Sequence, residues 1–164
     1  MPIHVALYQP EIPPNTGNIA RTCVATNVDL HLIHPLGFDI DEKTARRAGM
    51  DYWEHAVLYH YDSLDDMFAK YPDASFYFVE TGGNKVHTDV DFSNVDEDIF
   101  FVFGRESSGL PKDLLAANVD KILTIPMTNK VRSLNLSNTA AILIYEALRQ
   151  QNYANIFQSI QHFL

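Results

Sequence analysis

Short apolar segments alternate with helical patterns along this chain, and this alternation limits the folds that it can adopt. The predicted strands are 4–9, 30–34, 75–80, 98–103 and 121–125. Several of them are apolar on both faces, as in strands that are buried inside a parallel sheet. The predicted helices are 16–26, 41–49, 62–71, 111–117 and 137–151. This order predicts an α/β fold in which a mostly parallel sheet carries helices on both faces.

Nothing in the sequence divides the chain into parts. Its 164 residues contain no internal repeat, low-complexity tract or Gly/Ser-rich linker, so we expect a single domain over 1–164. No apolar run approaches the roughly 18 residues that a membrane span requires, and the first residues lack the basic region of a signal peptide. We therefore expect a cytoplasmic protein that makes no contact with a membrane.

The cysteine and the histidines do not form a recognisable chemical motif. Cys23 lies in a helical pattern without a flanking His or acid, which favours a small core residue over a nucleophile. The segment H-L-I-H ends at His34, but no H-E-x-x-H motif or group of cysteines accompanies it. The sequence therefore predicts no metal site.

The acidic charge of the chain is regional. The formal net charge is -9, yet residues 51–120 hold 15 acids and four bases, whereas the rest of the chain holds six acids and eight bases. Phosphate binding depends on Lys and Arg. The two mildly basic ends are therefore the better candidates for contact with a nucleic acid.

Four loops rich in Gly, Pro, Asn and Ser follow predicted strands. They are 10–18, 81–85, 104–111 and 126–138. In a parallel sheet the carboxyl ends of the strands meet at one edge, where ligands collect. We therefore expect these loops to form one binding site.

Several familiar motifs are excluded by the residues of these loops. Leu110 and Pro111 stand where a phosphate-binding loop needs Lys and Ser or Thr, and Arg105 stands where G-x-S-x-G needs Gly. No strand is followed by G-x-G-x-x-G. What remains suits an adenosine-type cofactor without a polyphosphate. The groups expected to bind it are the amides freed by Gly82, Gly83, Gly104 and Gly109, the polar side chains of Asn129, Ser133, Asn135, Ser137 and Asn138, and the apolar Ile125, Met127 and Leu134.

The residues alone leave several roles open. Arg21 is either a functional cation or an arginine that extends from a helix edge to solvent, and Glu106 is either a site residue or an ordinary turn acid. The basic cluster 43–47 is either a solvated helix face or a phosphate contact. The segment 132–138 is either a helix cap, through Ser137 or Asn135, or part of a site.

Three segments taken together resemble a known family. N-T-G-N-I-A-R at 15–21, F-G-R-E-S-S-G-L-P at 103–111 and I-P-M-T-N-K-V-R-S-L-N-L-S-N at 125–138 are similar to the three ordered motifs of the SPOUT RNA 2′-O-ribose methyltransferases. The small single-domain branch that methylates the wobble nucleotide of tRNA, cytidine or uridine 34, is the most similar, and residues 153–164 lie outside the resemblance. The resemblance implies a trefoil knot at the C-terminal end, S-adenosyl-L-methionine as cofactor, and a homodimer whose subunits share residues between their sites.

The resemblance also assigns roles to residues. It implies cofactor contacts from Val79, Gly104, Ile125, Met127, Ser133 and Leu134. It implies catalytic roles for Arg21, which would orient the ribose hydroxyl, and for Glu106 and Asn135, which would position the arginine or the loops. It leaves Lys43, Arg46, Arg47, Lys130 and Arg132 for the phosphates of the tRNA anticodon stem-loop.

The chain departs from the branch at a few positions. Arg105 and Ser108 stand where Pro and Arg are more usual, and E-T-G-G at 80–83 replaces T-T-K-G. These departures concern RNA docking more than the cofactor. Two alternatives remain: 2′-O-methylation of another tRNA or rRNA position, and a non-catalytic RNA-binding protein with the same fold.

Overall fold

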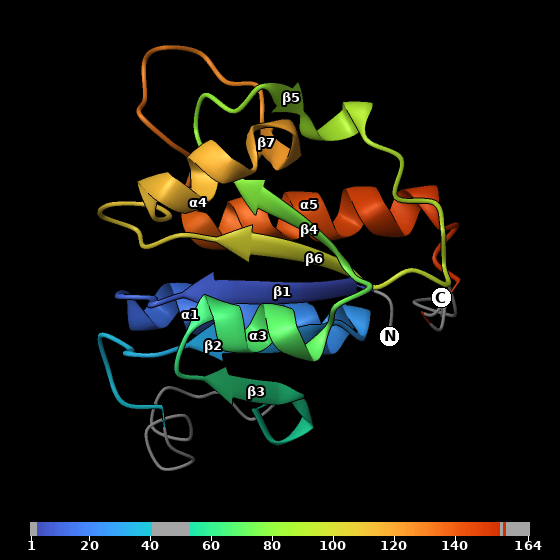
Figure 1. Ribbon diagram of the computed structural model, residues 1–164. Helices are drawn as coiled ribbons and strands as arrows, with labels where there is room; N and C mark the ends of the chain where they lie inside the picture. The colour runs from blue at the N-terminus through green and yellow to red at the C-terminus, as the bar shows by residue number, and fades with distance from the viewer. Residues whose placement is uncertain (1–2, 41–52, 155, 157–164) are drawn as a thin grey trace, which may run out of the picture.

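The protein folds around a single parallel sheet (Figure 1). The structure is a computed structural model that describes residues 3–40, 53–154 and 156. The seven strands pair in the order β3-β2-β1-β6-β4-β7-β5, and every pair is parallel. The strands are β1 Ile3–Tyr8, β2 Asp29–Ile33, β3 Leu58–Tyr61, β4 Ser75–Val79, β5 Lys85–Val86, β6 Ile99–Phe103 and β7 Ile122–Thr124.

Four α-helices and three short 3₁₀ helices complete the described part of the chain. The α-helices are α1 Pro13–Thr26, α3 Leu64–Lys70, α4 Lys112–Ala117 and α5 Leu136–Gln150, and the 3₁₀ helices are η1 Trp53–His55, η2 His87–Asp89 and η3 Val119–Lys121. Ser63 caps α3 by accepting a hydrogen bond from the amide of Asp66. The two prolines at the start of α1 suit its first turn, where backbone N–H groups have no partner inside the helix.

The predicted elements are confirmed, within a few residues at their ends, wherever the structure describes them. All five predicted strands are present, and so are the helices within 16–26, 62–71, 111–117 and 137–151. The helix predicted over 41–49 lies outside the described residues. Two strands were missed: β3, which has the four residues Leu-Tyr-His-Tyr and no strong apolar pattern, and β5, which has two residues. Both lie at the edges of the sheet, where the apolar pattern is weakest.

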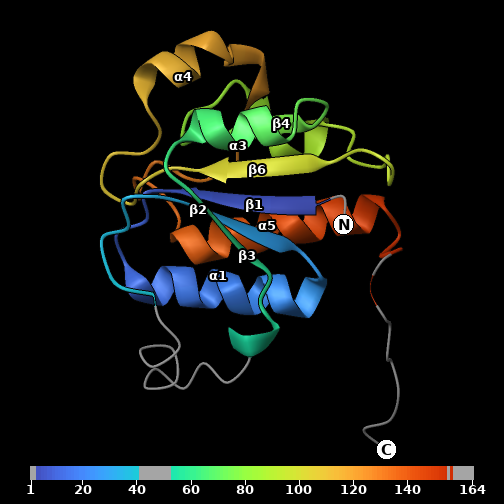
Figure 2. The ribbon, with the colours of Figure 1, turned by 60° about the horizontal axis from the view of Figure 1, so that its bottom comes forward.

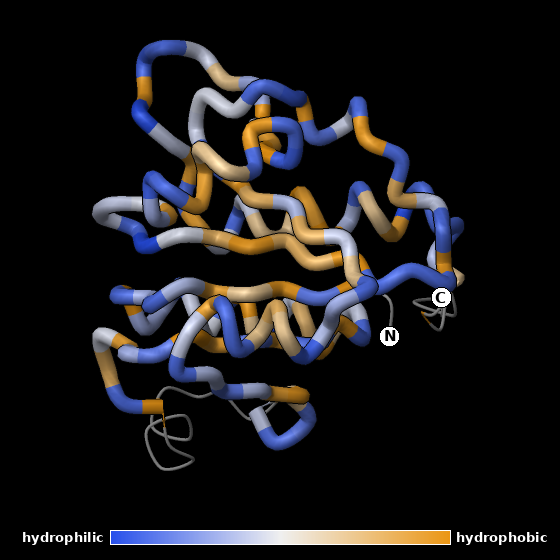
Figure 3. The backbone as a smooth tube through the Cα atoms, viewed as in Figure 1, coloured by the Kyte–Doolittle hydropathy of each residue, from blue (hydrophilic) through white to orange (hydrophobic). Residues whose placement is uncertain are grey.

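The helices cover both faces of the sheet, and each face has its own core (Figure 2). On one face α1 and α5 pack together, with Ile19 and Cys23 of α1 and Ile144 of α5 fully buried or nearly so. On the other face Met67 of α3 packs against the sheet. The central strand β6 is buried at all five positions, and Figure 3 shows it as a hydrophobic run. Burial also raises the pKa of the Cys23 thiol to about 12, so the thiol stays protonated and unreactive near pH 7. Cys23 is therefore a core residue and not a nucleophile.

A chain of buried polar rings crosses the second core. His4 Nδ1 lies 3.0 Å from His31 Nε2, and His31 Nδ1 lies 3.0 Å from the Tyr61 hydroxyl. The other nitrogen of His4 lies 3.0 Å from a carboxylate oxygen of Asp98. Burial lowers the pKa of both imidazoles, that of His31 to about 3. The two rings are therefore neutral in the folded protein near pH 7.

No described helix has the length and apolar character to cross a bilayer. Within 3–40, 53–154 and 156, no three His, Cys, Asp or Glu side chains gather in a way that would hold a metal ion.

Candidate active site

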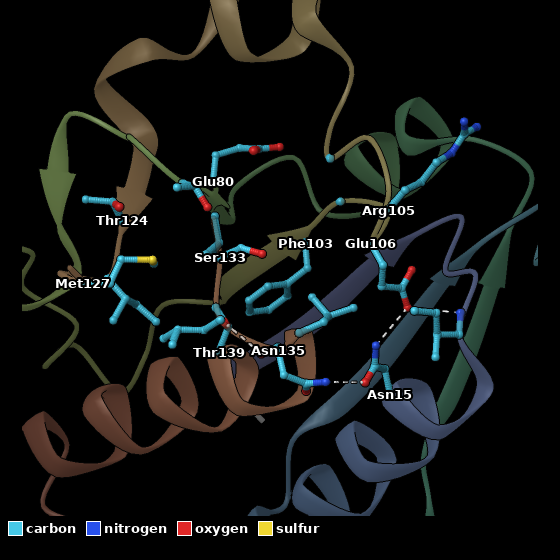
Figure 4. A pocket seen from close by; sticks show the side chains of 18 residues that line it. Asn15, Glu80, Phe103, Arg105, Glu106, Thr124, Met127, Ser133, Asn135 and Thr139 are labelled. Carbon is cyan, nitrogen blue, oxygen red and sulfur yellow. Dashed lines mark hydrogen bonds between the residues drawn. The ribbon is translucent and has the colours of Figure 1, made fainter. Parts of the chain in front are cut away.

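A pocket of about 430 Å³ opens at the carboxyl ends of β4, β6 and β7 (Figure 4). All six residues expected at the cofactor line it, and Glu106 and Asn135 join them. The lining residues are Ile12, Asn15, Val79, Glu80, Thr81, Phe103, Gly104, Arg105, Glu106, Gly109, Thr124, Ile125, Met127, Ser133, Leu134, Asn135, Leu136 and Thr139. Segments that are more than 100 residues apart in the sequence thus meet at one site.

The loop after β6 closes tightly on itself. The amide of Gly109 donates to the carbonyl of Arg105 at 2.8 Å, and the amide of Arg105 donates to the carbonyl of Gly109 at 3.1 Å. Gly109 has a φ of 70°, which a residue with a side chain rarely adopts. A Cβ on Gly104 would lie 2.2 Å from the carbonyl carbon of Gly109. Both glycines are therefore required for the loop to form this wall of the pocket.

Gly104→Ala is expected to weaken both the fold and the pocket. The new methyl group meets backbone rather than a flexible side chain, so the loop must move. We expect the free energy of unfolding to fall by about 1–3 kcal/mol, a typical cost of overpacking. Urea denaturation would measure it. The control is Ser108→Ala, because Ser108 is an exposed residue of the same loop. Equal stability of G104A and the wild type would contradict the close packing of Gly104 against the backbone of Gly109.

Glu106 joins the loop after β6 to the start of α1. Its carboxylate accepts hydrogen bonds from the amides of Glu11 at 2.9 Å and Ile12 at 3.2 Å, and from the side-chain amide of Asn15 at 3.4 Å. Ile12 is the N-cap of α1 and its own side chain makes no capping hydrogen bond. An anion at this position suits the positive end of the helix. Glu106 is therefore more than a surface turn acid, since it holds the loop after β6 against the start of α1.

Asn135 continues this connection to α5. Its Nδ2 donates to Oδ1 of Asn15 at 3.0 Å, and its Oδ1 accepts from the amides of Ser137 at 2.9 Å and Asn138 at 3.4 Å. The residue thus caps α5 while its side chain lines the pocket. Segment 132–138 was predicted to be either a helix cap or part of a site. Asn135 caps α5 and also lines the pocket, so this segment serves both purposes.

Other predicted site residues lie away from the pocket lining. Arg21 is exposed on α1, and Lys130 and Arg132 are exposed in the loop between β7 and α5. Lys43, Arg46 and Arg47 lie outside the described residues.

The predicted set of free glycine amides is corrected by the structure. Gly82 and Gly83 are not part of the lining, and the amide of Gly83 donates to the carbonyl of Glu80 at 3.4 Å. The amide of Gly109 is taken up inside its own loop. Gly82 and Gly109 have φ angles of 80° and 70°, which suit turns, and Gly83 leaves room for Ile122, whose Cγ2 would lie 2.8 Å from a Cβ on Gly83.

Sequence reasoning missed several lining residues. Asn15, Glu80, Phe103 and Thr124 each stand at or just beyond the end of a strand or the start of a helix at this edge of the sheet. Glu80 gave a signal, because it is an acid directly after a buried strand. Arg105 also lines the pocket, and its guanidinium carbon lies 5.3 Å from the centre of the Tyr8 ring, a cation–π distance.

The pocket combines apolar walls with a few polar groups, as small-molecule sites do, and its volume suits a ligand of nucleoside size. Ile125, Met127 and Leu134 supply apolar surface, and Ser133 and Thr124 supply hydroxyls. The arrangement is able to bind a heterocycle with attached polar groups and to shield one side of it from water.

Comparison with known proteins gives a consistent result. Residues 2–145 match the SpoU rRNA Methylase family. A relative from Bacillus subtilis (strain 168), provisionally named tRNA (cytidine(34)-2'-O)-methyltransferase, is 61% identical over 154 residues, which cover 94% of this chain and 96% of the relative. A protein from Saccharophagus degradans with the same name, unqualified, is 42% identical over 152 residues, which cover 92% of this chain and 97% of the relative.

Solved structures agree. The crystal structure of a Bacillus anthracis protein, provisionally described as an RNA methyltransferase, has a TM-score of 0.93 at 57% identity and covers 96% of this chain and 99% of its own. A structure described as giving insights into 2-OH methylation of C/U34 on tRNA has a TM-score of 0.83 at 41% identity, with coverage of 92% and 96%. Because the family match and these likenesses extend over most of its length, the chain belongs to the SpoU rRNA Methylase family.

Proposed function

We propose that the protein is an S-adenosyl-L-methionine-dependent tRNA methyltransferase that modifies the ribose 2′-hydroxyl of the wobble nucleotide, cytidine or uridine 34. The observation that carries this proposal is the pocket at the sheet edge, whose lining comes from the same three segments that carry the family resemblance. The names of relatives at 42–61% identity support the choice of tRNA and of position 34.

The pocket fits the proposed cofactor. Its apolar wall of Ile125, Met127 and Leu134 suits an adenine ring, and Val79 and Gly104 bring backbone groups to the same space. Ser133 adds a hydroxyl from the loop before α5. When bound, S-adenosyl-L-methionine supplies a methyl group that a positively charged sulfur has already activated. The chain's contribution is then mostly alignment of the attacking hydroxyl.

The proposal gives separate roles to the three residues expected to be catalytic, Arg21, Glu106 and Asn135. A guanidinium offers five donors and no acceptor, so Arg21 orients the ribose hydroxyl and an adjacent phosphate rather than removing a proton. Glu106 and Asn135 hold the start of α1 and the start of α5 together through Asn15. Lys43, Arg46, Arg47, Lys130 and Arg132 are proposed to contact phosphates of the anticodon stem-loop.

The proposed enzyme acts in the cytoplasm as a single-domain, knotted homodimer. The position of Arg21 outside the lining of its own subunit's pocket supports a site that takes this residue from a second copy. Ile142 and Tyr145 of α5 are 37% and 47% exposed and offer apolar surface for such contact. The knot rests on the resemblance of residues 103–111 and 125–138 to the SPOUT motifs.

Methyl transfer from labelled cofactor is the direct test. Purified protein would be incubated with tRNA and, separately, with rRNA from cells that lack wobble 2′-O-methylation, and the labelled nucleotide would be mapped. We expect label in tRNA at position 34. Label at another tRNA position or in rRNA would replace the substrate, and cofactor binding without transfer to any RNA would leave a non-catalytic binding protein.

A further inference from the structure

Glu80 stands out among the pocket residues because its carboxylate has acceptor capacity that the protein leaves unused. Among the described residues, one hydrogen bond reaches this carboxylate, from the amide of Leu110 to Oε1 at 2.7 Å. The other carboxylate of the lining, Glu106, accepts from three donors. An ionised carboxylate offers about four acceptor positions. Glu80 is therefore the acid of this pocket that is prepared to accept from a ligand.

The backbone of Glu80 is fixed to the sheet. It follows β4 directly, and its amide donates to the carbonyl of Leu123 in β7 at 3.1 Å. Its side chain also fills the space beside Gly109, where a Cβ would lie 2.4 Å from Oε1. A side chain on a strand end with a packed neighbour keeps its geometry better than one on a free loop. Figure 4 shows it at the pocket wall between Thr124 and Arg105.

We propose that Glu80 binds the ribose of the cofactor by accepting hydrogen bonds from its 2′- and 3′-hydroxyls. This inference rests on the proposed function. The heterocycle is assigned to the wall of Ile125, Met127 and Leu134, and Glu80 is the next residue after Val79 at the same edge. The ribose is bonded directly to the heterocycle, so it is the first polar part of the ligand beyond that wall. Its two adjacent hydroxyls match the two oxygens of a carboxylate, and acids at strand ends bind ribose in this way in dinucleotide folds.

Binding measurements with sugar-modified ligands test this assignment. Isothermal titration calorimetry with S-adenosylhomocysteine would measure the affinity of wild type, Glu80→Ala and Glu80→Gln. Competition against labelled S-adenosyl-L-methionine would compare adenosine with 2′-deoxyadenosine and 3′-deoxyadenosine on the same proteins. We expect E80A to bind S-adenosylhomocysteine about 10- to 100-fold more weakly, in line with the loss of hydrogen bonds to a charged group, and E80Q to lose less.

The ratio between adenosine and its deoxy forms is the decisive reading. Wild type should prefer adenosine about tenfold, and E80A should bind the three nucleosides alike, because the hydroxyls have lost their partner. The control is Glu11→Ala. The Glu11 carboxylate accepts from the amide and hydroxyl of Ser107, at 3.1 and 2.7 Å, so it supports the same loop from outside the pocket lining. E11A should keep the wild-type ratio.

Other outcomes overturn the assignment. An unchanged ratio in E80A would mean that Glu80 acts only through Leu110 and the loop. Weaker binding of S-adenosylhomocysteine with unchanged binding of adenosine would move the carboxylate to the amino-acid part of the ligand. Either result leaves the proposed function standing. Failure of the wild type to bind S-adenosylhomocysteine or S-adenosyl-L-methionine would overturn the proposed function as well.

Discussion

Arg21→Ala is expected to lower the rate of methyl transfer on the order of a hundred- to a thousand-fold while cofactor affinity changes less than about twofold. The rate falls because the variant loses the cation that, in the proposed function, aligns the hydroxyl and phosphate, and removal of a single stabilising donor has an effect of this size. The affinity holds because the proposed contacts of Arg21 are with the ribose hydroxyl and phosphate of the RNA and not with the cofactor. Single-turnover transfer into tRNA and calorimetric binding of S-adenosylhomocysteine would measure the two quantities separately.

Arg21→Lys is the matched variant, because it keeps the charge and loses the planar fork. It should recover only part of the rate. A loss of cofactor affinity in R21A would contradict the proposed role and assign the arginine to the cofactor pocket.

Mixed dimers would show whether Arg21 acts on the pocket of its own subunit or on that of the partner subunit. Subunits carrying R21A and subunits carrying G104A would be co-expressed with different tags, and the heterodimer isolated. If Arg21 acts on the partner's pocket, the intact pocket of the R21A subunit meets the intact arginine of the G104A subunit, so activity returns at one site. If Arg21 acts within its own subunit, both sites stay defective. Recovery would support the shared site, and its absence would exclude it.

Acid is expected to destabilise the protein well before its carboxyl groups are protonated. The folded-state pKa of His31 is about 3, lowered first by burial and then by His4 and Lys70. Its value in the unfolded chain is about 6.5. Below pH 6.5 the unfolded state therefore binds a proton that the folded state refuses, and stability falls as the pH drops toward 3. The slope approaches about 1.4 kcal/mol per pH unit, and the loss between pH 6.5 and 4.5 is about 2 kcal/mol.

Urea denaturation at a series of pH values would measure this slope. His31→Gln keeps a donor and an acceptor for His4 and Tyr61 and removes the titrating group, so its slope should be shallower by about one proton. H31Q should still lose some stability in acid, because His4 remains and burial lowers its pKa more than Asp98 raises it. His55→Gln serves as the control because the His55 side chain is 69% exposed. Equal slopes in H31Q and wild type would contradict a neutral, buried His31.

The architecture was readable from the sequence because the central strands carry a strong signal. β6 is five consecutive apolar residues, all buried, so its pattern and its environment agree. β3 and β5 were missed for the converse reason. Their positions are decided by pairing with β2 and β7, and not by a pattern of their own. The predicted start of α1 was three residues late. Two consecutive prolines are typical of a turn, and the sequence does not show that the carboxylate of Glu106 accepts a hydrogen bond from the N-cap residue, Ile12.

The site was readable only in part. Residues of the three motifs lie together at the pocket, and the six residues that the resemblance assigned to the cofactor all line it. The partners of those residues were not predictable, since Glu106 meets Glu11 across 95 positions and Asn135 meets Asn15 across 120. Glycines were misread for a similar reason. The sequence does not show whether the amide of a glycine is available to a ligand or is used inside a turn. At Gly109 the hydrogen bond from its amide to the carbonyl of Arg105 shows the second case.

The hydrogen bonds from Glu106 through Asn15 to Asn135 have a practical consequence for exchanging parts between relatives. The first turn of α1, the loop after β6 and the cap of α5 each supply one member of this set. A chimera that imports one of these segments from a relative breaks the set unless the imported residue makes the same bonds. The three segments therefore form the smallest unit that is safe to transplant, although they are far apart in the sequence.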